Sequence, residues 1–291
     1  MKDTNCCLTG RGSVSFAAAI LGSVVLLQGA PARAVPSGAS VLAPHRAIYD
    51  MKLDETKPAS GVTNYNGRLV FEVTGSPCEG YTVNMRHVVR LTDSAGQAML
   101  MDRRSSTWEQ GDGSEFRFNY SNYVDEKLSE STSGSAFRGA VPNELDIQIK
   151  KPEQSNRKLG GSMLFPTQHS LAILNGAQSG KSVVQSKVFE GFEKEERVFN
   201  TTAFIGKQTP PGADGQLDEV ENGKVLSTLP SWPVTISYFD GKGGGEETPS
   251  YEIRFKMFAN GVSRDLSIDY GSFAIRGSLR SLEFLKTADC K

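Results

Sequence analysis

The side chains best suited to catalysis or metal binding are scattered along this 291-residue chain. Its histidines, His45, His87 and His169, lie far apart, and no two have the spacing that places metal ligands on one helix or strand. The chain also lacks the Gly-x-Ser-x-Gly motif of a nucleophile elbow. We therefore predict no catalytic residue, no cofactor site and no metal site. A hydrolase using His169 or His87 is the weaker alternative, because a catalytic triad can assemble from distant segments.

Arginines alternate with apolar residues in several segments. If several of them faced one concavity, their guanidinium groups would form a cradle for an anionic group through bidentate hydrogen bonds. The alternative is that they belong to the wet face of a sheet and pair with acidic residues across strands. The arginines of the predicted cradle are Arg86, Arg90, Arg117, Arg254 and Arg276.

Residues 1–34 have the features of a Sec-type signal peptide. Lys2 and Arg11 precede an apolar stretch from Val14 to Ala30, which is short for a membrane anchor. The sequence Ala-Arg-Ala at residues 32–34 then supplies a cleavage site. We predict cleavage after Ala34, export from the cytoplasm and a mature chain that does not span the membrane.

Removal of residues 1–34 changes the charge and the cysteine count. The whole chain has 32 basic and 33 acidic residues, and the leader removes three basic residues and one acidic residue, which leaves a net charge of −3. This balance argues against a nucleic-acid partner. Cys78 and Cys290 are the two cysteines that remain. Two thiols in an exported protein usually pair, so a disulfide is expected, with two free thiols as the alternative.

Alternation of apolar and polar residues with a period of two dominates the mature chain. It predicts roughly a dozen or more strands joined by short connections, and therefore an antiparallel meander, in one domain of residues 35–291. Asn260-Gly261 is the strongest hairpin signal and predicts a type I′ turn. The clearest strand segments are Tyr65–Val73, Tyr81–Leu91, Phe116–Tyr120, Leu145–Ile149, Tyr251–Phe258 and Leu266–Tyr270.

One segment, Phe165 to Gly176, has the pattern of a short helix. Pro166 suits the first turn, and Gly176 suits the position after the last turn. Such a helix would plug the end of a barrel or a concave sheet. The segments Lys151 to Gly161 and Gly206 to Gly223 are predicted to be loops, and Ser129 to Ser135 a polar turn.

Several segments together resemble the cell-envelope-integrity family typified by EipB of Gram-negative bacteria. The resemblance extends over essentially the whole mature chain. It implies a large antiparallel β-spiral, an incompletely closed barrel with one or two short helices, and a disulfide between Cys78 and Cys290. The segments that carry the resemblance are Leu42–Leu53, Asn66–Val70, Cys78–Thr82, the helix motif with Phe165, Pro166 and His169, Ser237–Phe239 and Cys290.

The resemblance also implies a function. It indicates a non-enzymatic periplasmic protein that maintains the cell envelope under stress by binding a partner protein or an envelope amphiphile. A periplasmic tetratricopeptide-repeat protein is the partner that the family suggests. A periplasmic carrier of lipids or lipoproteins is the alternative.

Overall fold

The structure is a computed structural model. It describes residues 40–286 apart from 58, 140, 142, 192–197, 216, 218 and 241–247. The predicted signal peptide, its cleavage site and Cys290 lie outside the described residues, so the proposed domain limits stay a prediction.

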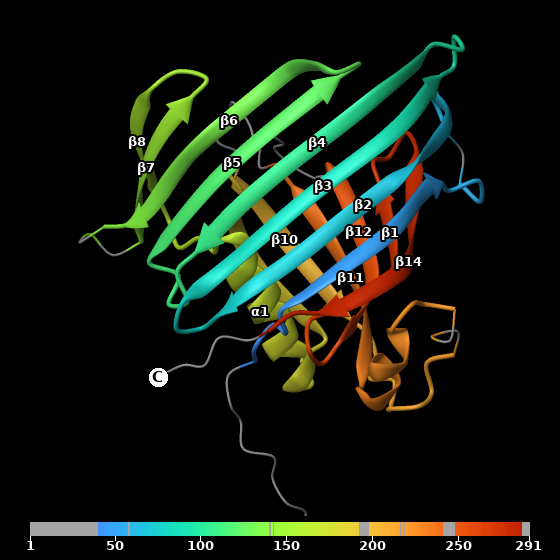
Figure 1. The fold of residues 1–291 in the computed structure, drawn as a ribbon. Coiled ribbons are helices and arrows are strands. Elements are labelled where there is room, and N and C mark those ends of the chain that lie inside the picture. The colour runs from blue at the N-terminus through green and yellow to red at the C-terminus, as the bar shows by residue number, and fades with distance from the viewer. Residues whose placement is uncertain are drawn as a thin grey trace, which may run out of the picture. The chain divides into compact units, whose positions relative to one another are not determined.

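The described strands form one fourteen-stranded antiparallel sheet (Figure 1). The sheet order is β8-β7-β6-β5-β4-β3-β2-β1-β14-β13-β12-β11-β10-β9, so strands from opposite ends of the chain, β1 and β14, are neighbours. The strands are β1 (His45–Leu53), β2 (Val62–Ser76), β3 (Gly80–Asp93), β4 (Ala98–Glu109), β5 (Glu115–Val124), β6 (Lys127–Arg138), β7 (Glu144–Lys151), β8 (Ser155–Gly160), β9 (Val183–Phe189), β10 (Val198–Ile205), β11 (Ser231–Phe239), β12 (Tyr251–Phe258), β13 (Ser263–Asp269) and β14 (Ala274–Phe284).

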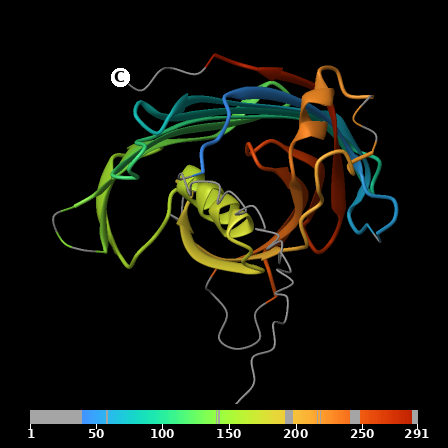
Figure 2. The same cartoon turned by 90° about the horizontal axis from the view of Figure 1, so that it is seen from below.

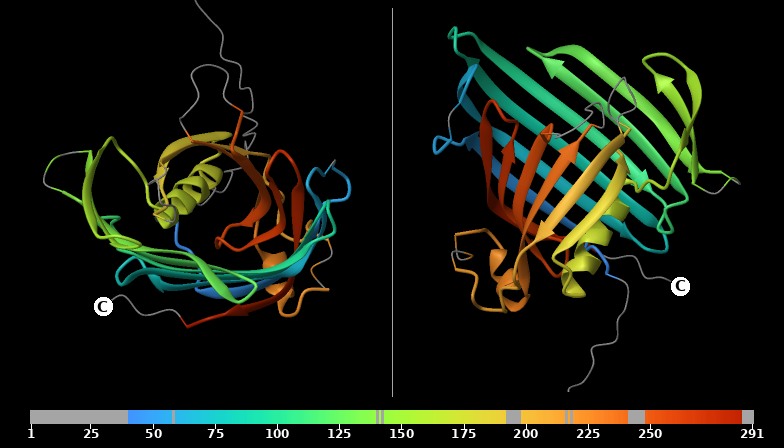
Figure 3. Two further views of the ribbon diagram at one scale, coloured as in Figure 1. Left: turned by 90° about the horizontal axis from the view of Figure 1, so that it is seen from above. Right: turned by 180° about the vertical axis from the view of Figure 1, so that it is seen from behind.

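The sheet curls around the α-helix α1 (Pro166–Gln178), which lies on its concave side (Figures 2 and 3). A short 3-10 helix, η1 (Gly223–Thr228), precedes β11. The edge strands β8 and β9 do not pair with each other, so the barrel is not closed. This arrangement confirms the predicted all-β fold and the incompletely closed antiparallel spiral.

A cluster of phenylalanines joins strand β5 to the edge strand β9. Phe116 on β5 stacks against Phe165 at 5.0 Å between ring centroids and meets Phe189 of β9 edge-on at 6.3 Å. All three side chains are fully buried. Leu164 also exchanges backbone hydrogen bonds with the edge of β9. The cluster therefore fixes the N-terminal end of α1 against β5 and β9.

The helix begins as predicted but ends later. Pro166 occupies its first turn, whereas Gly176 lies inside the helix and not after it. A Cβ at Gly176 would lie 2.6 Å from Cγ2 of Val184, so this glycine makes room for β9. Gly180, with φ of +73°, takes the left-handed position after the helix. Among the described residues, no helix is long and apolar enough to cross a membrane.

Three other local predictions need correction. The segment Ser129 to Ser135 is strand and belongs to β6, and Lys151 to Gly161 contains the edge strand β8. The Asn260-Gly261 hairpin exists between β12 and β13, but Gly261 alone of the pair has positive φ. Bonds from Gly261 N to Phe258 O and from Phe258 N to Val262 O define a three-residue loop in place of a type I′ turn.

Candidate functional site

The concave face of the sheet carries apolar side chains that are only partly buried. Strand register places Phe71 of β2 opposite Met85 of β3, and Leu91 of β3 opposite Met99 of β4. These side chains share the face of buried core residues, but each retains solvent-accessible surface. A packed barrel interior would bury them completely. The concave face therefore offers accessible apolar surface beside its core.

The opposite wall of the curl continues this lining. Its inward-facing apolar residues come from β12, β13 and the turn before β14, and they also remain half-buried. Apolar linings with a few polar groups are typical of ligand sites. These residues are Ile253, Phe255, Leu266, Ile268 and Phe273.

A polar band crosses the concave lining. One row places His87 of β3 beside Arg103 of β4, which in turn lies opposite Asn122 of β5. The next row contains Ser105, Tyr120 and Thr132 on β4, β5 and β6. We refer to these six residues as the inner polar band. It places one guanidinium group among uncharged donors and acceptors.

His87 in this band and Tyr65 beside it are neutral at physiological pH. The Tyr65 hydroxyl lies 3.3 Å from Nε2 of His87. Burial, with a smaller contribution from the Arg103 charge, lowers the pKa of His87 to about 4. Burial raises the pKa of the Tyr65 hydroxyl, and Arg103 opposes that rise. Arg103 therefore supplies the positive charge next to this pair.

His169 of the helix motif is held by structural contacts. It is 4% exposed, its Nε2 lies 3.1 Å from Oγ1 of Thr201 on β10, and its ring meets Tyr238 edge-on. Burial lowers its pKa to about 4. His45 is also buried and lies against the carbonyl oxygen of Ala43. The structure therefore keeps His45, His87 and His169 apart, in three separate environments.

The N-terminus of α1 is capped by a residue that the sequence analysis did not identify. The backbone N–H groups of Thr167 and Gln168 each donate a 2.8 Å hydrogen bond to the buried carboxyl group of Glu109. Burial raises the pKa of Glu109 to about 7, although these hydrogen bonds favour the ionised form. The available signal was that Phe165 precedes Pro166 without a capping side chain of its own.

The five arginines of the predicted cradle lie on the convex face and do not converge on one site. All five are exposed. Arg86 of β3 pairs with Asp102 of β4 at 2.8 Å, and Arg117 of β5 pairs with Glu115 of the same strand at 2.6 Å. Arg90 lies further along β3. Arg254 and Arg276 are the two that come near each other, on β12 and β14.

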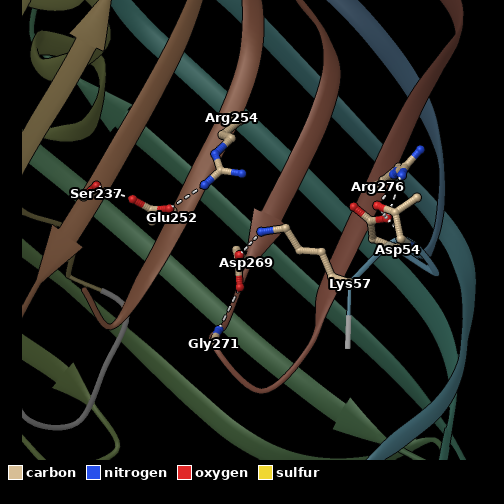
Figure 4. Close-up of polar contacts among 9 residues, drawn as sticks. Asp54, Lys57, Ser237, Glu252, Arg254, Asp269, Gly271 and Arg276 are labelled. Carbon is tan, nitrogen blue, oxygen red and sulfur yellow. Dashed lines mark hydrogen bonds and ion pairs between the residues drawn. The ribbon is translucent and has the colours of Figure 1, made fainter. Parts of the chain in front are cut away.

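Arg254 and Arg276 border a hollow of about 460 Å³ on the convex face. Figure 4 shows both side chains beside their carboxylate partners. Arg254 pairs with Glu252 at 2.8 Å, and Arg276 pairs with Asp54 at 2.7 Å. Lys57 pairs with Asp269 in the same region. Each of these cations therefore already has a carboxylate partner, which leaves little unbalanced charge for an anion. A ligand role for these arginines stays a prediction.

The predicted disulfide also stays a prediction. Cys78 lies in the exposed turn between β2 and β3, and Cys290 lies outside the described residues.

The fold and the lining define an open, antiparallel β-barrel-like protein with an accessible concave face. The sequence profile of the EipB-like family matches residues 36–286, and the chain belongs to this family. It is 36% identical over 279 residues to the cell envelope integrity protein EipB of Brucella abortus (strain 2308). This alignment covers 96% of this chain and 97% of that protein.

A solved structure agrees with this assignment. A crystal structure of a β-barrel-like protein of a domain of unknown function from Brucella abortus matches the fold with a TM-score of 0.76. The sequence identity is 35%, and the match covers 85% of this chain and 100% of that one.

Proposed function

We propose that this chain is a periplasmic protein that maintains the integrity of the cell envelope by holding an amphiphile against its concave face, without catalysis. Membership of the EipB-like family supports the envelope role, since the similar Brucella protein is named for it. The predicted signal peptide supports the compartment.

The half-buried apolar lining carries the binding part of the proposal. Phe71, Met85 and Met99 face the interior of the spiral yet stay accessible. Exposed apolar surface in water is unfavourable, at roughly 25 cal/mol per Å², and an acyl chain would relieve it. The absence of pairing between the described edge strands β8 and β9 distinguishes this fold from a closed barrel.

Native mass spectrometry of the exported protein, followed by lipid extraction, tests the proposal. We expect a bound amphiphile in the parent protein and its loss in Met85→Asp, which places a charge on the lining. Val88→Asp is the matched control, because Val88 lies on the same strand and faces the opposite side of the sheet.

The outcomes separate amphiphile binding from its alternatives. A parent protein without amphiphile, and without affinity for added lysolipids, would contradict the proposal and leave binding of a partner protein as the envelope function. Accelerated lipid transfer between donor and acceptor vesicles would extend the proposal to a carrier, whereas an unchanged transfer rate would restrict it to binding.

A further inference from the structure

We propose that Arg103, Asn122 and Thr132 bind the headgroup of an anionic amphiphile that carries at least one hydroxyl or N–H donor. This inference rests on the proposed function and adds the class of ligand. The three residues lie on adjacent strands β4, β5 and β6, within the inner polar band.

Arg103 differs from its neighbour Arg104 in having no acidic partner in the part of the chain that the structure describes. Arg104, the next residue, faces the convex side and pairs with Asp102 at 2.6 Å. Among the described residues, no carboxylate lies within ion-pair distance of Arg103. Glu130 lies in the same row but two strands away, about 10 Å at the usual strand spacing. The guanidinium group of Arg103 contacts Sδ of Met101 and hydrogen-bonds the hydroxyl group of Tyr270, but its positive charge is not balanced by a described carboxylate.

Three buried polar atoms of the band have no hydrogen-bond partner in the described part of the chain. They are Nε of Arg103, Oδ1 of Asn122 and Oγ1 of Thr132. Thr132 is only 1% exposed. Buried polar atoms are almost always paired, because an unpaired one loses its hydration without gaining a hydrogen bond in return. Three such atoms in two adjacent rows indicate a surface shaped for a ligand.

The donor and acceptor types define the headgroup. The guanidinium group of Arg103 donates, and it suits a phosphate or carboxylate. Asn122 Oδ1 only accepts, so the ligand must carry an O–H or N–H group, and the Thr132 hydroxyl can serve either role. A headgroup that combines an anion with hydroxyl groups satisfies all three.

Apolar residues adjoin the band in two directions. Val89 and Met101 lie in the next row on one side, and Met85 of β3 and Phe71 of β2 continue the row of Ser105 across the sheet. An acyl chain attached to a headgroup at Arg103 would therefore contact apolar surface at once. This continuity favours an amphiphile over a free anion.

The test compares two lysolipids of identical chain length, lysophosphatidylglycerol and lysophosphatidylcholine, by calorimetry below their critical micelle concentrations. We expect the parent protein to bind lysophosphatidylglycerol at least 10-fold more tightly. In Arg103→Gln the affinity for lysophosphatidylglycerol should fall to that for lysophosphatidylcholine, so that the preference disappears. Arg104→Gln, the same substitution one residue away on the convex face, should retain the preference.

Failure of this inference and failure of the proposed function give different results. If the parent binds both lysolipids equally, or if Arg103→Gln keeps the preference, the headgroup site is wrong and amphiphile binding stands. If the parent binds neither lysolipid, the proposed function is wrong as well. The comparison within the parent protein needs no variant, so the test holds even if Arg103→Gln folds poorly.

Discussion

The two faces of strand β4 differ in how their charged side chains are paired. On the convex face, Asp102 accepts hydrogen bonds from Arg86 and Arg104, and the whole network is in contact with water. On the concave face, Arg103 has no carboxylate partner among the described residues, and Nε of its guanidinium group has no hydrogen-bond partner among them. A step of one residue thus separates a paired ion network from a cation whose Nε is unpaired within the described part of the chain.

This difference agrees with the proposed binding role of the concave face. Exposed ion pairs contribute little to stability but keep the convex face soluble and its charges balanced. Unpaired polar atoms on the concave face are a cost to the unliganded protein, as is common at binding sites. The comparison yields three predictions, in order of decreasing effect.

The largest effect is expected from the phenylalanine cluster on the concave side. Phe116→Ala should lower the free energy of unfolding by about 3–5 kcal/mol, because it removes a fully buried ring that contacts Phe165 and Phe189. Phe204→Ala, on the convex face of β10 and 52% exposed, should change it by less than about 0.5 kcal/mol. Urea unfolding monitored by circular dichroism measures both. Similar losses in the two variants would contradict the assignment of the faces.

The next effect depends on pH. The pKa of His87 is about 4 in the folded protein and 6.5 in the unfolded chain, so the unfolded state binds more protons between these values. This contribution to stability is complete above pH 6.5 and is lost as the pH falls towards 4, by about 2–3 kcal/mol. His87→Gln should flatten this part of the stability profile. An unchanged slope in the variant would show that His87 is not buried as a neutral group.

The smallest effect is expected on the convex face. Burial would raise the pKa of Asp102, but its bonds to Arg86 and Arg104 outweigh burial and lower it to about 2. Its contribution is therefore present above pH 3.8 and is lost only as the pH falls towards 2. Asp102→Asn should cost about 1 kcal/mol at neutral pH, and less at high salt because both arginines are half exposed. A loss that does not respond to salt would contradict a screened surface network.

Sequence patterns predicted that residues alternate between the two faces of each strand. They did not predict which face the curl of the sheet makes concave. Alternation marked β3 and β12 correctly, but it left open whether Arg86 and Arg254 face a concavity or the wet face of the sheet. The partners Asp102 and Glu252 depend on strand register and local geometry, which the pattern does not contain. Arg103 and Arg104 are adjacent, so one of them must face inward, but only the curl of the sheet shows which one.

The wrong local predictions have a physical explanation in the packing. Gly134 made the segment from Ser129 to Ser135 resemble a turn, yet the segment lies in β6. A glycine stands at this position of the strand because a Cβ would come 2.8 Å from Cζ of Phe118. The charged composition of β8 resembled a loop, but charges are common on edge strands, where they prevent pairing with other chains. In both cases the tertiary neighbour decided the structure.

The central claim is that the concave face accepts an amphiphile, and methionine methyl NMR tests it most directly. Met85 and Met99 lie on the accessible lining, whereas Met163 is 3% exposed within the phenylalanine cluster. A lysophosphatidylglycerol with a nitroxide on its acyl chain should broaden the methyl signals of Met85 and Met99 and leave that of Met163 sharp. Unchanged Met85 and Met99 signals at saturating lipid, or equal broadening of all three, would contradict the account.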